Sequence, residues 1–274
     1  MDRIKVFNTG ETQEELRAKY NPEGSKLRKM QKRMLDMLLY IDDICKKQNI
    51  KWRLDGGNVL GAVRHGGFIP WDDDVDIVLE KQEFNRLVKY LLKNPHPQYV
   101  LQCNETDKGF YEHGCVVLRD MKSEYKQDTW VHKARKYKGA QIDIFQYDTH
   151  ISPFLNKVTQ KILFYQTKYY IGRNPYISQF IYWILRYIIN PCLKIIGYPF
   201  TSGQYYAHSY GRIYSYQLPK DVVYPYKPID FEGYKFPGPA KPEKLVEIIY
   251  SPNYMNLPPV TDRNHHQADY EIWD

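Results

Sequence analysis

The sequence has few cysteines and no segment typical of an exported protein. Four cysteines are spread over 274 residues, at positions 45, 103, 115 and 192, and no two form a C-x-x-C pair. This excludes a disulfide scaffold and is typical of reduced thiols in a cytosolic protein. The first residues lack the apolar run of a signal peptide, so we expect a cytoplasmic protein. No Cys and His cluster has zinc-ligand spacing.

Long basic blocks and long apolar runs are also absent. The net charge of +7 comes from dispersed Lys and Arg, which suits anionic small molecules, glycans or membranes but does not indicate nucleic acid. The most apolar stretch, residues 177–200, is interrupted by Arg186, Asn190, Pro191 and Lys194. We therefore expect no spanning helix there. The stretch either touches the inner face of the cell membrane peripherally or forms ordinary core helices.

Periodicity divides the chain into three parts. Residues 1–24 are predicted to be an irregular lead-in, 25–150 a core of alternating helices and strands, and 151–274 a helical, Tyr- and Pro-rich portion packed on that core. Apolar spacing predicts helices over 25–48, 81–92, 154–170 and 177–189, and near 242–250, with Pro191 ending regular structure. Alternation predicts strands over 50–55, 74–79, 99–102, 114–119 and 141–145. The fold class is α+β.

The richest stretch joins glycines to aspartates. Five glycines fall at positions 56, 57, 61, 66 and 67, and Asp72, Asp73, Asp74 and Asp76 follow. On a strand, Asp74 and Asp76 point to one face, and Asp72 joins them if the strand starts early. Such carboxylates repel one another and raise each other's pKa values unless a cation lies between them. Oxygen ligands of this kind select Mg²⁺ or Mn²⁺.

A further carboxylate stands alone in an apolar strand. Asp143 lies between Ile142 and Ile144, and burying it requires a compensating partner. A metal site with ligands Asp74, Asp76 and Asp143 supplies one. The alternative is an acidic, solvated turn at 72–74. The Gly56-Gly57 turn before a short helix allows close approach of a phosphate to backbone N–H groups, although a plain tight turn has the same signature.

These residues together resemble the LicD family. The resemblance covers residues 25–150 and rests on the segments Gly56-Gly57, Leu60-Gly61-Ala62-Val63-Arg64, Gly67-Phe68-Ile69-Pro70-Trp71-Asp72-Asp73-Asp74-Val75-Asp76, and Ile142-Asp143-Ile144-Phe145 with Asp148. It departs from the family at Asn58, where Thr or Ser is usual, and at 250–254, where the family has Y-G-D and this chain has no Asp. Asn58 keeps a donor for phosphate.

The resemblance implies a nucleotidyltransferase-like fold, a small mixed sheet flanked by helices. It also implies transfer of a phospho-alcohol headgroup from a CDP-alcohol, CDP-choline first, to a cell-surface or lipid-linked glycan such as lipopolysaccharide, teichoic acid or capsule. An acceptor hydroxyl would attack the β-phosphorus and CMP would leave. Asp74, Asp76 and Asp143 would hold the metal, with Asp143 or Asp72 handling the proton. Gly56, Gly57, Asn58 and Arg64 would bind the donor's phosphates.

Two other functions use the same residues. Nucleotidyl transfer would move NMP to an acceptor and release pyrophosphate instead of CMP. A non-catalytic glycan-binding module would keep the fold, but it has no need of mutually repulsive carboxylates. The 26 tyrosines, 14 of them between Tyr165 and Tyr226, suit sugar or choline ligands, and equally an aromatic core with half-wet edges.

Overall fold

A mixed β-sheet forms the centre of the protein. The structure, a computed structural model of the chain, describes residues 7–212, 216–263 and 269–273. Within these residues the sheet has the order β1 (Arg53–Leu54), β2 (Asp76–Glu80), β6 (Gln141–Asp148), β4 (Cys115–Asp120), β3 (Tyr99–Gln102), with β7 (Tyr205–His208) pairing the end of β6 and β8 (Leu218–Pro219) pairing β7. Among these pairs only β2 and β6 run parallel.

The parallel pair sets the position of the acidic residues. Asp76 lies opposite Asp143, and Ile77 lies opposite Ile144. Ile77 and Ile144 are fully buried in the core, so alternation along both strands puts the two aspartates together on the other face. The apolar pattern of the strands thus determines where the carboxylates meet.

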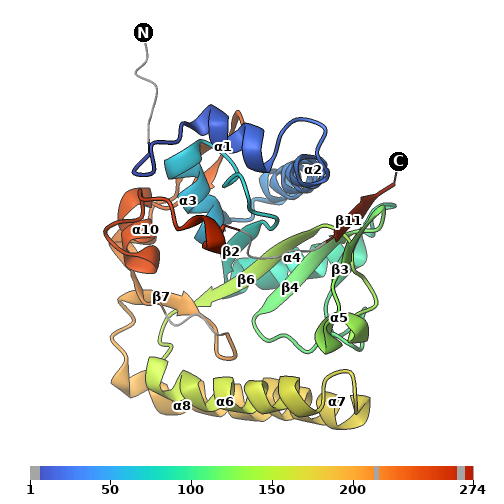
Figure 1. The fold of residues 1–274 in the computed structure, drawn as a ribbon. Coiled ribbons are helices and arrows are strands. Elements are labelled where there is room, and N and C mark those ends of the chain that lie inside the picture. Colours follow the sequence, from blue (N-terminus) through green and yellow to red (C-terminus); the bar gives the residue numbers. More distant parts are fainter. Residues whose placement is uncertain (1–6, 213–215, 264–268, 274) are drawn as a thin grey trace.

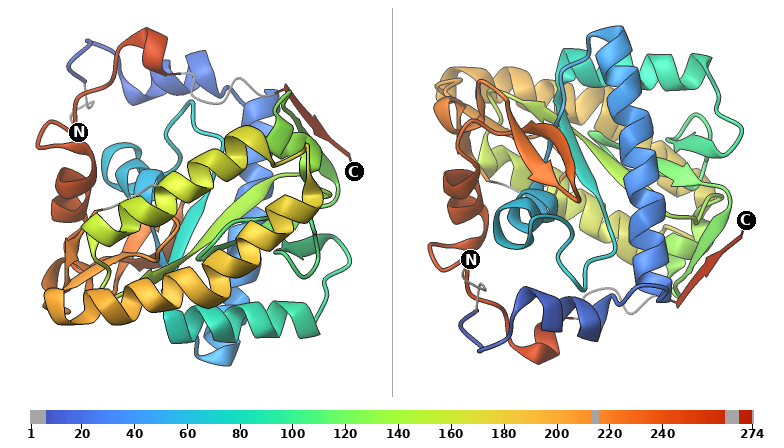
Figure 2. Two further views of the ribbon diagram at one scale, coloured as in Figure 1. Left: turned by 90° about the horizontal axis from the view of Figure 1, so that it is seen from below. Right: turned by 90° about the horizontal axis from the view of Figure 1, so that it is seen from above.

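Two long helices flank the sheet as their apolar spacing predicts. Helix α2 (Lys26–Gln48) begins at the N-cap Ser25, whose hydroxyl accepts from the Arg28 N–H at 3.2 Å. Its core stripe, including Met34 and Ile41, is fully buried. Helix α4 (Lys81–Lys93) follows β2 directly. Figure 2 shows α2 crossing above the sheet in one view, and two later helices crossing below it in the other.

The lead-in differs from the sequence prediction. Residues 13–20 form helix α1 (Gln13–Tyr20), not an irregular segment. Thr12 and Glu15 form a reciprocal capping box that satisfies the first N–H groups of the helix. Leu16 on this helix is fully buried. Residues 1–6 lie outside the described part of the chain.

The longest helical segment of the C-terminal half also differs from the prediction. Helix α6 (Pro153–Tyr169) is followed by α7 (Pro175–Ile184), a π-helical turn (Leu185–Ile189), α8 (Asn190–Gly197) and a 3₁₀ turn (Tyr198–Phe200). The last four run on without a break, so Pro191 does not end the helix. Pro191 follows the π-helical turn, where the regular i→i−4 bonding is already interrupted, so the missing N–H of proline is tolerated there.

The C-terminal portion contributes to the central core. Strand β7 pairs with β6, and β11 (Asp269–Ile272) pairs with β5 (Ser123–Lys126). The remaining elements are α3 (Gly56–His65), α5 (Trp130–Ala134), α9 (Lys220–Val223), β9 (Lys227–Phe231), β10 (Tyr234–Gly238), α10 (Pro242–Tyr250) and a 3₁₀ turn (Val260–Asp262). A mixed sheet with separate helices agrees with the predicted α+β class (Figure 1). The predicted three-part division of the chain stays a prediction.

Candidate active site

A cavity of about 480 Å³ holds most of the predicted site residues. It lies between the start of α3, residues 69–76 before and at the start of β2, the end of α10 and the loop 251–258. Gly57, Arg64, Asp72, Asp74 and Asp76 all line it. The structure thus brings together residues from both the Gly-rich and the acidic halves of the motif.

Three aspartates at every second position of the chain line the wall of the cavity. Asp72, Asp74 and Asp76 line it, although β2 starts only at Asp76, so the first two belong to an extended lead-in and not to the strand. Burial and the neighbouring Asp74 carboxyl raise the pKa of Asp72 well above its usual range, and the two carboxyls contact each other. Burial, Asp74 and Asp143 raise the pKa of Asp76 in the same way.

Asp73 does not line the cavity and is hydrogen-bonded within the protein core instead. It is buried, its carboxylate accepts a hydrogen bond from the Tyr270 hydroxyl of β11, and its carbonyl accepts one from the Tyr125 hydroxyl of β5. These bonds tie the acidic segment to the β5–β11 pair. Asp72, and not Asp73, therefore shares the cavity with Asp74 and Asp76.

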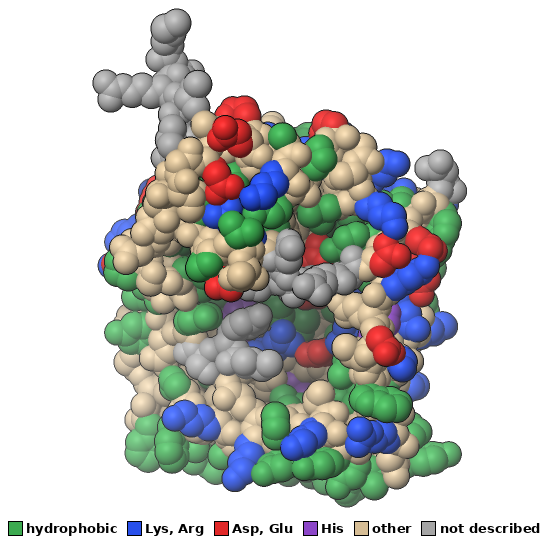
Figure 3. Space-filling view, in the orientation of Figure 1, with side chains coloured by type: hydrophobic (Ala, Val, Ile, Leu, Met, Phe, Trp, Pro, Cys, Tyr) green, Lys and Arg blue, Asp and Glu red, His purple; other side chains and the backbone are tan. Residues whose placement is uncertain are grey.

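Asp143 lies beside Asp76 but faces basic side chains. Burial raises the pKa of Asp143, while the Arg119, Arg212 and Arg135 guanidinium groups oppose that shift. Arg135 and Arg212 are bridged by Glu112, at 2.8 and 2.6 Å. Figure 3 shows a hollow in this face, over β4 and β6, with acidic, basic and His side chains in it. The Arg135 side chain in this cluster is half-buried.

The predicted metal site with ligands Asp74, Asp76 and Asp143 stays a prediction. Among the described residues, no three His, Cys, Asp or Glu side chains are arranged so that they could hold an ion. The arginines near Asp143 provide the compensating charge that the prediction assigned to a metal. Asp74 and Asp76 fit a cation better, because Mg²⁺ is commonly bound by one or two carboxylates, water and substrate phosphates. Burial and the neighbouring carboxylates raise the pKa of Asp76 because they disfavour its charged form.

Two glycines and a tyrosine border the cavity at the N-terminus of helix α3. Gly56 has a φ of 48°, and a Cβ there would lie 3.1 Å from Asp76 Oδ2; one on Gly57 would lie 3.2 Å from Asp72 Oδ2. Either Cβ would also lie 3.8 Å from the Tyr250 hydroxyl. Burial and the Asp76 carboxylate raise the pKa of that hydroxyl. Tyr250 stands where the sequence comparison found no acid, so the sequence drew attention to the segment but not to this residue.

Asn58 and Arg64 hold the walls of the cavity. The Asn58 side chain accepts from the Asp76 N–H and donates to the Asp74 carbonyl at 3.4 Å, so it fixes the backbone between these carboxylates. Arg64 is buried, donates to the Tyr254 and Asn256 carbonyls at 2.9 and 3.1 Å, and has its pKa lowered to about 10 by burial. Both therefore position the site; their binding of phosphate stays a prediction.

A buried ionic network anchors the start of α3. Asp55 stands at the N-cap position, yet its side chain makes no cap bond. It accepts instead from Arg53 Nη1 at 2.9 Å and the Tyr147 hydroxyl at 3.0 Å, and lies 3.3 Å from His208 Nε2. Although burial pushes the pKa of Asp55 up, Arg53 and His208 hold it well below its usual range. No local sequence pattern reveals this network, because its members come from three distant segments.

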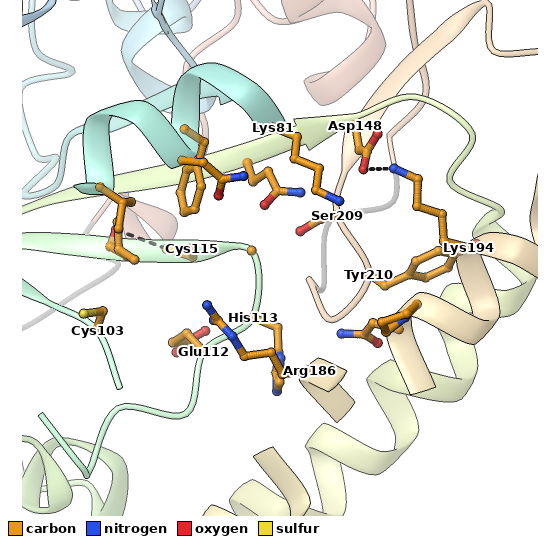
Figure 4. A pocket seen from close by; sticks show the side chains of 18 of the residues that line it. Lys81, Cys103, Glu112, His113, Cys115, Asp148, Arg186, Lys194, Ser209 and Tyr210 are labelled. Carbon is orange, nitrogen blue, oxygen red and sulfur yellow. Dashed lines mark hydrogen bonds and ion pairs between the residues drawn. The ribbon is translucent and has the colours of Figure 1, made fainter. Parts of the chain in front are cut away.

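A second cavity of about 480 Å³ lies between the sheet, α4 and the helix α7–α8. Figure 4 shows Glu112, His113 and Arg186 on one side, and Lys81, Ser209 and an Asp148–Lys194 ion pair on the other. The His113 Nε2 and Ser209 Oγ atoms are buried and have no hydrogen-bond partner among the described atoms. Cys115 in its wall belongs to β4, which pairs with β6, the strand that carries Asp143.

The protein is of the α+β class, and its carboxylate-lined cavity lies at the N-terminus of α3, which begins with two glycines. Residues 49–177 match the family model of the LicD/FKTN/FKRP nucleotidyltransferase domain. This range contains every site residue predicted from the sequence. Over these residues the chain is similar to the LicD family.

Curated relatives agree with this assignment. The lipopolysaccharide cholinephosphotransferase LicD of Haemophilus influenzae is 33% identical over 122 residues, 44% of each chain. An uncharacterized protein of Rickettsia prowazekii is 28% identical over 144 residues, 46% of this chain and 53% of its own. The human ribitol 5-phosphate transferase FKRP is 45% identical over 38 residues, 14% of this chain and 8% of its own. The matches thus span about half, or less, of these relatives' lengths.

Proposed function

We propose that the protein is a metal-dependent phosphotransferase. It moves a phospho-alcohol headgroup, phosphocholine first, from a CDP-alcohol to a hydroxyl of a cell-surface or lipid-linked glycan, and it works in the cytoplasm. The observation that carries the proposal is the cavity in which Asp72, Asp74 and Asp76 face the glycine-opened start of α3. The names of the relatives, a cholinephosphotransferase and a ribitol 5-phosphate transferase, support phospho-alcohol as the transferred group.

The donor's diphosphate suits the carboxylate cavity. Mg²⁺ or Mn²⁺ held by Asp74 and Asp76 would supply positive charge for the diphosphate and the departing CMP. Gly56 and Gly57 leave room for phosphate oxygens next to the first N–H groups of α3, where the helix dipole favours anions. Tyr250 and Tyr254 line the cavity, and aromatic side chains are suited to binding a quaternary ammonium group.

The transfer needs one proton to move. The acceptor oxygen forms a bond to the β-phosphorus, the bond from that phosphorus to the bridging oxygen breaks, and CMP leaves with the electron pair. The acceptor's proton goes to a carboxylate. Asp72 is the better base than Asp143, because it lines the cavity and because its raised pKa makes its carboxylate a stronger base than an ordinary one. The second cavity, with Tyr182 and Tyr210 in its walls, is the place we assign to the glycan acceptor.

Nucleotidyl transfer is the second candidate, because the matched family model describes a nucleotidyltransferase domain. Both activities use the same carboxylates, and the products separate them. The purified chain is incubated with Mg²⁺, a panel of CDP-alcohols and glycan acceptors. We expect CMP with one CDP-alcohol, and no pyrophosphate from CTP. Pyrophosphate release from nucleoside triphosphates would favour nucleotidyl transfer, and no product from either donor class would leave a binding module.

A matched pair of variants controls the assay. Asp76→Asn changes a cavity carboxylate, whereas Asp43→Asn changes an exposed carboxylate that pairs with Lys47 on α2. CMP release should disappear in the first and persist in the second. Equal activity in both variants would exclude the carboxylate cavity as the site of transfer.

A further inference from the structure

Two antiparallel helical segments form one layer beneath the sheet. We call α6 together with the continuous helix Pro175–Phe200 the helical hairpin. Thr159 Oγ1 donates to Asn190 Oδ1 at 3.2 Å, and Gln166 Nε2 donates to the Ser178 carbonyl at 2.8 Å. Figures 1 and 2 show the two segments side by side, on the side of the sheet away from α2.

The polarity of the hairpin is inverted. Its buried positions include Asn156, Thr159, Gln166 and Ser178. Beside exposed basic residues, its exposed positions include many aromatic and aliphatic side chains: Phe154, Val158, Phe164, Tyr165, Tyr169, Tyr176, Ile177, Phe180, Trp183, Tyr187, Ile188, Ile195, Ile196, Tyr198 and Phe200. A helix on the surface of a protein in water buries its apolar stripe and exposes polar residues. Polar side chains between helices and apolar ones outside are typical of helices in lipid.

The charge of the hairpin favours one kind of partner. From Pro153 to Phe200 the sequence has no Asp or Glu, and its charged residues are all basic: Lys157, Lys161, Lys168, Arg173, Arg186 and Lys194. The last two face Glu105 and Asp148 of the core, which leaves the first four at the outer surface. Figure 3 shows the apolar lower edge with a row of basic side chains above it. Two copies meeting through this surface would repel each other, whereas anionic lipid headgroups would attract it.

Contacts with the core decide how the hairpin meets the lipid. The helix Pro175–Phe200 is long and apolar enough to span a bilayer. It is held to the core near both ends and in the middle, however. Gln179 exchanges two hydrogen bonds with Asn104, at 2.9 and 3.1 Å, Tyr182 stacks on His113 at 4.8 Å, and Lys194 pairs with Asp148. A spanning helix would have to give up these contacts, so the hairpin lies flat.

We propose that the outer face of the helical hairpin is a binding surface for an anionic membrane, inserted into the headgroup region of one leaflet without crossing it. The aromatic rings lie at the boundary of headgroups and acyl chains, where Trp and Tyr are favoured. Lys157, Lys161 and Lys168 reach the lipid phosphates. The surface brings the second cavity, whose wall includes Arg186 and Lys194, next to the bilayer. The proposal does not depend on the proposed reaction.

Vesicle flotation of the full chain tests the proposal. The vesicles contain phosphatidylethanolamine and phosphatidylglycerol in one set and phosphatidylcholine alone in the other. We expect the wild type to float with the anionic vesicles at low salt and much less with the neutral ones. The triple variant Phe180→Ser, Trp183→Ser, Ile188→Ser should bind at least about a hundredfold more weakly, since it loses three side chains from the inserted face. The protein left at the bottom with anionic vesicles would overturn the proposal.

Two controls separate membrane binding from misfolding and from other partners. Leu92→Ser, Met121→Ser, Tyr234→Ser removes three other exposed apolar side chains, outside the hairpin, and should float like the wild type. Lys157→Gln, Lys161→Gln, Lys168→Gln should lose most of the preference for anionic vesicles. Brominated lipids should quench Trp183 most strongly with bromine near the headgroup. Strongest quenching at the bilayer centre, or a stable dimer that the Ser variant dissociates without vesicle binding by the wild type, would overturn the proposal.

Discussion

Replacing Asp55 by Asn removes the charge that compensates a fully buried arginine. Arg53 has no exposed surface, and Asp55 Oδ1 accepts from its Nη1 at 2.9 Å. In Asp55→Asn the amide cannot balance the guanidinium, and its NH₂ group faces the donors of Arg53 and Tyr147. Loss of one partner from a buried ion pair costs about 3–5 kcal/mol. For a chain of this size that lowers Tm by roughly 6–20 °C.

Urea unfolding followed by circular dichroism measures this loss against two references. Asp43→Asn removes an exposed pair with Lys47 and should change the free energy of unfolding by less than about 0.5 kcal/mol. The double variant Arg53→Met, Asp55→Asn removes the orphaned cation as well, and should recover most of the loss. A loss below about 1 kcal/mol in Asp55→Asn, or a double variant no more stable than it, would refute the role given to the network.

Four further results are expected. Asp74→Asn and Asp76→Asn should each reduce transfer by at least about a thousandfold yet leave Tm unchanged or higher, because each relieves carboxylate repulsion; near-normal turnover with a normal melting curve contradicts the site. Mg²⁺ or Mn²⁺ should raise Tm, and stoichiometric zinc in purified protein would be evidence against this assignment. Gly57→Ala should lower transfer about tenfold, since its Cβ would lie 3.2 Å from Asp72 Oδ2; unchanged kinetics would show that no ligand needs that space. Burial lowers the pKa of His113 to about 4, so the stability that neutral His113 contributes is complete above about pH 6.5 and falls by up to about 3 kcal/mol towards pH 4. In His113→Gln the urea midpoint should change less between pH 6.5 and pH 4 than in the wild type.

The sequence predicted the local elements that have strong signals of their own. Helices α2 and α4 are expected from apolar spacing, and both form. The grouping of Asp72 with Asp74 and Asp76 was expected from a period of two, and it holds although β2 is shorter than predicted. An extended segment alternates its side chains whether or not it pairs with a strand. The spacing of the aspartates therefore predicts correctly that they share one side, although Asp72 and Asp74 lie outside the hydrogen-bonded strand.

Other features needed long-range information. The capping-box pattern of Thr12 and Glu15 was present in the sequence and could have revealed α1. Tyr250 enters the cavity only because α10 packs on α3, and Arg135 reaches Asp143 only through the fold. The π turn before Pro191 depends on how the helix packs against the core, and proline alone wrongly indicated an end.

The helical hairpin shows a limit of reading amphipathicity from sequence. An apolar stripe tells which residues share a face, but it does not tell which medium that face meets. Applied to residues 153–200, the usual rule would turn Phe180 and Trp183 inward and Gln166 and Ser178 outward. The structure does the reverse: Gln166 and Ser178 are fully buried, and Gln166 Nε2 donates to the Ser178 carbonyl between the two helices. Water would then face a continuous apolar surface, which soluble proteins rarely tolerate. The sequence leaves these apolar residues undecided between core and membrane, and their exposure, with no acidic residue between 153 and 200, supports the proposed membrane surface.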